Sequence, residues 1–206
     1  MKILILGGFL GAGKTSLLVR AGKVLAARSE SASPVKVAVI ENEIGDAGVD
    51  DKVVENAGFS TTNLFSGCVC CTLGAEIVAT IREIQARLDP DVLIIESSGV
   101  GIPFKIQDTI RDRLGLEPVI VVLADCQRWL RLTRAAGTFI QDQLVRADLV
   151  LANKTDLVPA ETREAVVADL RARCPESEVI PCCLTDAGNE EVFERIAARL
   201  EARNHA

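Results

Sequence analysis

Short apolar runs alternate with amphipathic patterns along nearly the whole chain of 206 residues. Runs such as VKVAVI and PVIVVLAD are apolar at almost every position, which is typical of strands that are covered on both faces. The segment AEIVATIREIQARL instead repeats its apolar residues at the i, i+3 and i+4 spacing of a helix with one buried face. Strands and helices that alternate in this way predict a three-layer α/β/α fold around a mostly parallel sheet.

The boundaries of these patterns predict seven strands and six helices. The strands are expected at residues 2–6, 35–40, 61–65, 91–96, 118–125, 148–153 and 177–181. The helices are expected at about 14–28, 72–88, 103–114, 127–146, 159–173 and 188–203. No repeat or low-complexity tract interrupts them, and the Ser-rich segment RSESASP is predicted to be a loop. Residues 1–206 are therefore predicted to form a single domain.

Composition restricts the classes of partner. With 49% hydrophobic and 25% charged residues the chain has an ordinary globular composition, and its formal net charge of -6 offers no basic field for nucleic acid. The first apolar run is about five residues long, too short for a signal-peptide core or a membrane span. No later run approaches 18 apolar residues. We therefore expect a cytoplasmic protein with neither nucleic acid nor membrane as a partner.

The glycine-rich segment GGFLGAGKTS lies between the first predicted strand and the first predicted helix. From Gly8 to Thr15 it fits the pattern G-x-x-x-x-G-K-[ST], in which backbone amides and a helix N-terminus bind phosphates. Lys14 is expected to reach the β- and γ-phosphates, and Thr15 to bind Mg²⁺. The predicted phosphate-binding residues are Gly8, Gly11, Ala12, Gly13, Lys14, Thr15 and Ser16. A glycine-rich turn without a ligand is less favoured, because the flanking strand and helix are both predicted.

Two further strand ends carry residues suited to a nucleotide. In DVLIIESSG, the Glu96 carboxylate can hold Mg²⁺ through water and the Gly99 amide can contact a γ-phosphate. In LVLANKTD, Asn153, Lys154 and Asp156 follow a strand, at the edge where open α/β sheets bind ligands. An aspartate can accept hydrogen bonds from the N1 and N2 donors of guanine, whereas adenine offers no such donor pair. The sequence therefore favours GTP over ATP.

Five motifs follow one another along the chain: GGFLGAGKT, IENEIGDAGVDD, GCVCC, IIESSG and NKTD. Together they resemble the CobW/HypB/UreG group of P-loop GTPases, and the C-x-C-C element resembles its CobW-like metallochaperone branch. The resemblance covers essentially the whole chain. It implies GTP hydrolysis coupled to the handling of zinc, cobalt or nickel for a client metalloenzyme. It also implies a homodimer that depends on the nucleotide.

The chain departs from the CobW-like pattern at its C-terminus. CobW-like proteins usually carry a C-terminal domain and often a histidine-rich stretch, whereas this sequence has a single histidine, His205, and ends at Ala206. The resemblance thus implies a P-loop GTPase domain that stands alone. We therefore do not assign to this chain any role that the additional domain of CobW-like proteins has in client recognition or metal storage.

Three of the seven cysteines lie within four positions, at Cys68, Cys70 and Cys71. In an extended segment Cys68 and Cys70 point the same way, and a turn into the following helix can bring Cys71 round. Three thiolates with an exchangeable fourth ligand suit a soft or borderline cation such as Zn²⁺, and the resemblance implies Co²⁺ or Ni²⁺ as further candidates. Because the single histidine is at the C-terminus, the fourth ligand would be water, a partner protein, or a carboxylate such as Glu41 or Asp46. Packing and redox sensing are the alternatives to metal handling.

The remaining cysteines are spread through the second half of the chain. In a reduced compartment a lone cysteine usually behaves as a small buried apolar residue. The cysteines predicted to be buried in this way are Cys126, Cys174, Cys182 and Cys183.

These elements predict a mechanism of hydrolysis. Lys14 would stabilise the phosphate charge, Thr15 and Glu96 would hold Mg²⁺, and Asp50 or Asp46 would orient the attacking water. No glutamine follows the Glu96 motif, so slow hydrolysis without a partner is expected. Two other functions stay open. One is a P-loop small-molecule kinase, and the other is a non-hydrolysing, GTP-dependent regulatory module with a structural zinc.

Overall fold

The computed structural model describes residues 1–28, 35–40, 75–185 and 188–203. Their strands form one sheet in the order β2-β3-β1-β4-β5-β6, and all five pairings are parallel. The strands are β1 (Lys2–Gly8), β2 (Val37–Ile40), β3 (Val92–Glu96), β4 (Val119–Asp125), β5 (Leu149–Asn153) and β6 (Glu178–Pro181). The parallel α/β fold is confirmed. The described sheet has six strands where seven were predicted, because the strand expected at 61–65 lies outside the described residues.

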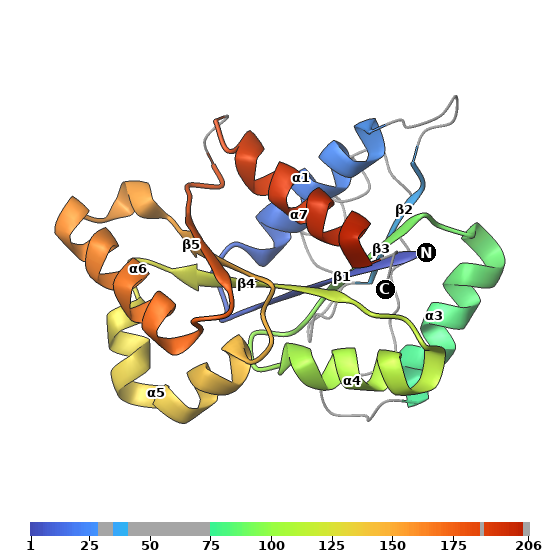
Figure 1. The fold of residues 1–206 in the computed structure, drawn as a ribbon, viewed down its shortest axis with the longest axis horizontal. Coiled ribbons are helices and arrows are strands. Elements are labelled where there is room, and N and C mark those ends of the chain that lie inside the picture. The colour runs from blue at the N-terminus through green and yellow to red at the C-terminus, as the bar shows by residue number, and fades with distance from the viewer. Residues whose placement is uncertain (29–34, 41–74, 186–187, 204–206) are drawn as a thin grey trace.

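Six α-helices of the described residues cover the sheet. They are α1 (Lys14–Ala27), α3 (Ala75–Leu88), α4 (Pro103–Leu114), α5 (Trp129–Leu144), α6 (Ala160–Arg173) and α7 (Glu190–Ala202). Figure 1 shows α1 and α7 on one face and α3, α4, α5 and α6 on the other. This arrangement is the predicted three-layer architecture. Among the described helices, none combines the length and the apolar character needed to cross a bilayer.

The period-two alternation of β1 divides the core between the two faces. Leu4 and Leu6 pack in the cluster that contains the apolar residues of α1 and α7, whereas Ile3 and Ile5 pack in the cluster with α3 to α6. All four side chains are at most 3% exposed. Because both faces are covered, the strand sequences are apolar throughout, as the sequence pattern indicates.

One predicted helix is less regular than its pattern suggests. The segment expected as a continuous helix over 127–146 is a helix from Trp129 to Leu144 with a kink at Ala136, where φ is -142° and ψ is 41°. The next residue is Gly137, whose low helical propensity accounts for the break.

The parallel sheet brings several loops to one edge. β1 lies between β3 and β4, and β5 pairs with β4, so the segments that follow β1, β3, β4 and β5 all leave at the carboxyl ends of neighbouring strands. This edge is where open α/β sheets bind ligands. It holds every described residue to which the sequence assigns a role at the nucleotide.

Candidate functional site

The loop between β1 and α1 requires glycine at both of its ends. Gly8 has φ +129° and Gly13 has φ +105°, in the region that L-residues avoid. A Cβ on Gly8 would lie 2.5 Å from the carbonyl oxygen of Leu123, and a Cβ on Gly13 would lie 2.6 Å from Nδ2 of Asn153. The first and last glycines of the motif are thus fixed by β4 and β5, the strands against which the loop packs.

Lys14 folds back over this loop. Its side chain is 6% exposed, and Nζ donates a hydrogen bond to the carbonyl oxygen of Gly8 at 3.0 Å and a longer one to Phe9 at 3.4 Å. Nζ also lies 4.0 Å from Oε1 of Glu96. The ammonium group is therefore held between the phosphate loop and the end of β3, the position predicted for a cation that meets phosphate oxygens.

Thr15 and Glu96 come together across 81 positions of sequence. Oγ1 of Thr15 lies 3.5 Å from Oε1 and 3.4 Å from Oε2 of Glu96, within long hydrogen-bond distance. β1 and β3 pair in register at Leu6 and Glu96, which brings the carboxylate beside the start of α1. A hydroxyl and a carboxylate are hard oxygen ligands, so this pair fits Mg²⁺.

Asn153 and Lys154 bind the phosphate loop itself. Nδ2 of Asn153 donates to the carbonyl oxygen of Ala12 at 2.8 Å, and Nζ of Lys154 donates to that of Gly11 at 2.7 Å. Asn153 is 3% exposed, and its Oδ1 accepts from the Leu184 amide at 3.0 Å. The sequence predicts Asn153 and Lys154 as nucleotide-binding residues, but their motif does not reveal that they clamp the loop.

Asp156 lies beside this clamp. It is exposed on the short 3-10 helix η1 (Thr155–Leu157) that follows β5. Thr155 donates to the carbonyl oxygen of Cys182 through its backbone amide at 3.2 Å and through Oγ1 at 3.0 Å. The segment after β6 therefore packs against the NKTD turn, and the Asp156 carboxylate is left at the surface, where a ligand can reach it.

Asp125, at the end of β4, was not identified from the sequence. Its side chain is 1% exposed, and Oδ2 accepts from Nε of Arg128 at 3.0 Å and from Nζ of Lys154 at 2.9 Å. Burial alone raises the pKa of Asp125, but the hydrogen bond and charge of Lys154, together with the hydrogen bonds from Arg128 and the Gln127 amide, outweigh burial and hold this pKa below its usual value. Arg128 also donates to the carbonyl oxygen of Leu10 in the phosphate loop. The sequence feature that could have identified Asp125 is its position as a carboxylate at the end of a strand.

Gln143 on α5 was also missed. It is 2% exposed, and its Oε1 accepts from the backbone amide of Gly8 at 3.1 Å. The partners are 135 positions apart, so no local motif reveals the contact. The sequence gives only a weak indication that Gln143 is buried. It is a polar residue between Ile140 and Leu144, which are both buried in the core.

The proposed metal residues cannot be placed. Cys68, Cys70 and Cys71, together with Asp50 and Asp46, lie outside the described residues. In the parts of the chain that are described, no group of three or more His, Cys, Asp or Glu side chains is arranged to hold a metal ion. The roles assigned to these residues stay predictions.

The four cysteines outside the C-x-C-C motif are buried, as predicted. They are Cys126, Cys174, Cys182 and Cys183, with at most 7% exposure. Burial raises the pKa of Cys126 to about 11 and that of Cys182 to about 12, so both are neutral thiols at pH 7. These cysteines act as small apolar residues within the core.

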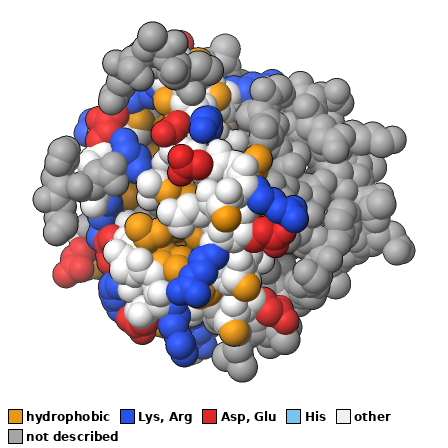
Figure 2. Space-filling view, turned by 90° about the vertical axis from the view of Figure 1, so that its right-hand side faces the viewer, with side chains coloured by type: hydrophobic (Ala, Val, Ile, Leu, Met, Phe, Trp, Pro, Cys, Tyr) orange, Lys and Arg blue, Asp and Glu red, His pale blue; other side chains and the backbone are white. Residues whose placement is uncertain are grey.

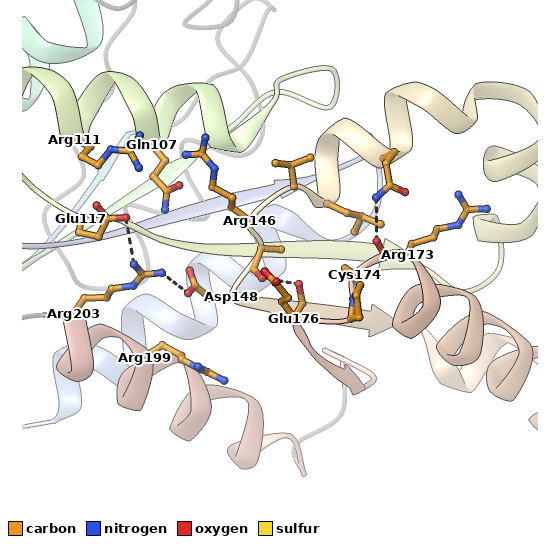
Figure 3. Close-up of a pocket in the computed structure, with 16 residues that line it drawn as sticks. Gln107, Arg111, Glu117, Arg146, Asp148, Arg173, Cys174, Glu176, Arg199 and Arg203 are labelled. Atoms are coloured by element: carbon orange, nitrogen blue, oxygen red, sulfur yellow. Dashed lines mark hydrogen bonds and ion pairs between the residues drawn. The ribbon is translucent and has the colours of Figure 1, made fainter. Parts of the chain in front are cut away.

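The opposite edge of the sheet is a charged surface. A groove of about 420 Å³ lies at the amino ends of β4, β5 and β6, and arginines reach it from several elements (Figure 3). Its arginines are in ion pairs, for example Arg203 with Glu117 at 3.2 Å and Arg146 with Asp108 at 2.6 Å. Figure 2 views this side of the molecule, where basic and acidic side chains are interspersed. The ion pairs tie the helix ends to the sheet edge.

Curated relatives of this chain are described as zinc chaperones. The chain is 29% identical over 216 residues to a zinc chaperone CobW from Pseudomonas aeruginosa, which covers 85% of this chain and 54% of the relative. It spans about half the length of the curated relatives it matches.

Solved structures of hydrogenase maturation factors share its fold. HypB from Archaeoglobus fulgidus superimposes with a TM-score of 0.72 at 20% identity, covering 97% of this chain and 90% of that one. HypB from Helicobacter pylori, in complex with nickel, gives a TM-score of 0.68 at 17% identity over 98% and 88% of the two chains. At these identities the likeness concerns the fold.

The sequence model of the CobW/HypB/UreG nucleotide-binding domain matches residues 2–181. The match runs from β1 through the phosphate loop, Glu96 and the NKTD turn to the end of β6. It thus includes each strand end at which the candidate site is built. Because it covers most of the 206 residues, the chain belongs to the CobW/HypB/UreG family.

Proposed function

We propose that residues 1–206 act as one GTPase domain that couples GTP binding and hydrolysis to the handling of a transition-metal ion for a client metalloenzyme. The observation that carries the nucleotide part is the clamp on the phosphate loop. Asn153 and Lys154, the first residues of the guanine-type motif, donate to the carbonyl oxygens of Ala12 and Gly11. The base-reading turn and the phosphate-binding turn are thus one connected unit.

Guanine is the base that this unit suits. Asp156 is an exposed carboxylate at the edge of the clamp, and a carboxylate accepts two hydrogen bonds from the N1 and N2 donors of guanine. Adenine would leave it unpaired. The neighbouring Lys154 is held in place, because its Nζ donates to Asp125 and to the Gly11 carbonyl of the phosphate loop.

The phosphates would be bound by the loop amides and by Lys14. Thr15 and Glu96 would hold Mg²⁺, which supplies charge neutralisation between the β- and γ-phosphates when it is bound. The Gly99 amide would contact the γ-phosphate. Gly99 lies close to the phosphate loop, because a Cβ at this position would be 2.8 Å from the backbone nitrogen of Leu10. Asp50 would orient the attacking water. The reaction converts GTP and water to GDP and inorganic phosphate.

The metal ion would be cargo held at Cys68, Cys70 and Cys71. Three clustered thiolates suit Zn²⁺ and also Co²⁺ or Ni²⁺. The curated relatives named zinc chaperones, and the HypB crystallised with nickel, support this class of cargo. The four described cysteines are buried, so they do not compete for the ion.

Association with a client and with a second copy would occur at the nucleotide edge. Leu10 in the phosphate loop is 77% exposed and Val100 after β3 is 65% exposed, unusual values for large apolar side chains. A partner that covers them would sense whether the γ-phosphate is bound. We place this activity in the cytoplasm, where thiols stay reduced.

The experiment is a metal titration in two nucleotide states. We expect the affinity for Zn²⁺, measured by competition with a chromogenic chelator, to differ between protein loaded with GDP and with a non-hydrolysable GTP analogue. The Cys68→Ser, Cys70→Ser and Cys71→Ser triple variant is the control, because it should lose the metal and keep the nucleotide. Equal Zn²⁺ affinities in both states would remove the coupling.

The same protein distinguishes the remaining functions. Incubation with γ-labelled GTP should release free phosphate. Transfer of the label to a small-molecule acceptor would instead identify a kinase. Negligible turnover together with a closed, four-ligand zinc spectrum would identify a regulatory module with a structural zinc.

A further inference from the structure

Gln143 joins two loops that the sequence assigns to different parts of the nucleotide site. Its Oε1 accepts from the amide of Gly8, at the start of the phosphate loop, at 3.1 Å. Its Nε2 donates to the carbonyl oxygen of Gly101, in the loop after β3, at 2.8 Å, with a longer contact of 3.4 Å to the carbonyl of Gly99. One side chain on α5 therefore bridges β1 and β3 at their carboxyl ends.

The chemistry of this bridge requires an amide. Gly8 presents a donor and Gly101 presents an acceptor, and a glutamine offers one acceptor and two donors in a single planar group. Gln143 is 2% exposed, so water does not substitute for either bond. Glutamate could accept from Gly8 but could not donate to Gly101, and methionine could do neither.

A second contact fixes α5 on the phosphate loop. The ring of Phe139, one helical turn before Gln143, packs edge-on against Phe9 with centroids 5.5 Å apart and an interplanar angle of 83°. Residues four apart share one helix face. The two side chains of α5 thus hold the two consecutive residues, Gly8 and Phe9, that begin the phosphate loop.

The loop after β3 is tied at both ends. At its start, Ser97 donates to the carbonyl oxygen of Leu6 through its amide and through Oγ, each at 2.9 Å. At its far end the bond from Gln143 holds Gly101, which also closes a turn onto Ser98 at 2.9 Å. Gly99 lies between the two anchors.

We propose that Gln143 is a positioning residue that fixes the loop after β3 relative to the phosphate loop and thereby sets the rate of GTP hydrolysis rather than the affinity for the nucleotide. This inference rests on the proposed function, in which the Gly99 amide meets the γ-phosphate. Although Gly8 is one of the predicted phosphate-binding residues, its amide already donates to Gln143 and is not left for a phosphate. The Gly101 carbonyl is an acceptor, as phosphate oxygens are, so neither atom that Gln143 bonds to contacts the nucleotide in this proposal. Small misplacements of a reacting group lower turnover much more than ground-state binding.

The chain offers a matched control at the other end of the sheet. Gln107 on α4 is also 2% exposed, and its Nε2 donates to the carbonyl oxygen of Pro118 at 3.0 Å. It lines the charged groove of Figure 3, far along the strands from the nucleotide edge. Its Oε1 has no hydrogen-bond partner among the described residues. Replacing Gln107 tests what a buried glutamine contributes without touching either loop.

The experiment compares Gln143→Met, Gln143→Glu and Gln107→Met in the full chain. We expect both Gln143 variants to lower kcat for GTP hydrolysis by about tenfold or more, while the Kd for GDP changes by less than about threefold. Hydrogen exchange of the amides of residues 97–102, measured without nucleotide, should accelerate in both. Gln107→Met should match the original protein in all three measurements.

The outcomes separate this proposal from the proposed function. If Gln143→Met keeps the original kcat, or loses kcat and GDP affinity in the same proportion, Gln143 is not a positioning residue. If the unaltered protein does not hydrolyse GTP at all, the proposed function fails, and hydrogen exchange then decides the present proposal. Unchanged exchange at residues 97–102 in Gln143→Met overturns it, and faster exchange there, absent from Gln107→Met, supports the tie between the two loops.

Discussion

Two aspartates at opposite edges of the sheet have similar partners and different consequences. Asp125 ends β4 at the nucleotide edge, and its carboxylate accepts from the backbone amide of Gln127 at 2.9 Å and from two cations, Arg128 and Lys154. Both cations also donate hydrogen bonds to carbonyl oxygens of the phosphate loop. The buried carboxylate therefore sets the position of the loop through the side chains that it holds.

Asp148 is the counterpart at the amino edge. Its carboxylate accepts from the backbone amide of Ile120 at 2.8 Å and from Nη2 of Arg203 at 2.6 Å, and it is 12% exposed. Arg203 also donates a hydrogen bond to a second carboxylate, that of Glu117. Neither of these two hydrogen bonds of Arg203 reaches a loop of the nucleotide site. A buried carboxylate that binds cationic side chains thus positions the phosphate loop at one edge of the sheet. At the other edge a similar carboxylate joins a helix to a strand.

Removing the negative charge of each aspartate tests whether the two edges have different roles. Asp125→Asn should lower the free energy of unfolding by about 2 to 3 kcal/mol, because two cations lose their buried partner while remaining partly hydrated. We expect the affinity for GDP to fall about tenfold as well, because Lys154 is no longer held. Urea denaturation and nucleotide titration measure the two effects.

Asp148→Asn is the matched variant at the amino edge. It should cost about 1 kcal/mol and leave GDP affinity unchanged. Equal losses of GDP affinity in the two variants would contradict the different roles of the two edges. The pKa of Asp125 is lowered, so its contribution to stability is present above its unfolded value and is lost as the pH falls through the folded one.

Buried thiols make the stability of the fold depend on pH in the alkaline range. Burial raises the pKa of Cys126 to about 11 and of Cys182 to about 12, so both keep their protons in the folded protein after the unfolded chain has ionised. The unfolded state then binds fewer protons, and stability falls as the pH rises above about 9, by up to about 1.4 kcal/mol per pH unit for each thiol. Cys126→Ala should flatten the slope between pH 9 and 11, measured by urea denaturation.

Cys174 provides the control for this slope at the amino edge. Burial raises its pKa as well, but a hydrogen bond with Ser177 lowers it. Cys174→Ala should therefore change the alkaline slope less than Cys126→Ala does. An unchanged slope in Cys126→Ala would show that this thiol is not the group that couples stability to alkaline pH.

The sequence predicts those parts of the site that belong to single strand ends. Lys14 and Thr15 follow one strand, Glu96 ends another, and Asn153 ends a third, and a parallel sheet brings such ends to one edge. Apolar runs and glycine positions are local properties, so each could be found by its own pattern. The strand expected at 61–65 and the cysteine cluster lie outside the described residues and stay predictions.

The parts that could not be predicted join distant segments through side chains. Gln143 meets Gly8 across 135 positions, and nothing in the helical pattern of α5 says which loop its polar group will reach. The bonds from Asn153 and Lys154 to phosphate-loop carbonyls depend on the register of β4 with β5, which no single motif contains. Local chemistry therefore identifies the ligand groups, and the three-dimensional arrangement identifies what holds them.

The smallest expected effect concerns the ion pairs of the amino edge. Arg203 is 34% exposed and pairs with Asp148 and Glu117. A guanidinium at this exposure exchanges its protein partners for water at little cost, so Arg203→Gln should lower the free energy of unfolding by less than about 1 kcal/mol. Screening by about 0.5 M NaCl should remove most of that difference. The cost of Asp125→Asn should persist in the same salt, because its carboxylate is shielded from ions by burial. If Arg203→Gln proves as costly as Asp125→Asn and equally insensitive to salt, then exposure does not distinguish the two edges and the amino-edge network contributes to the stability of the core.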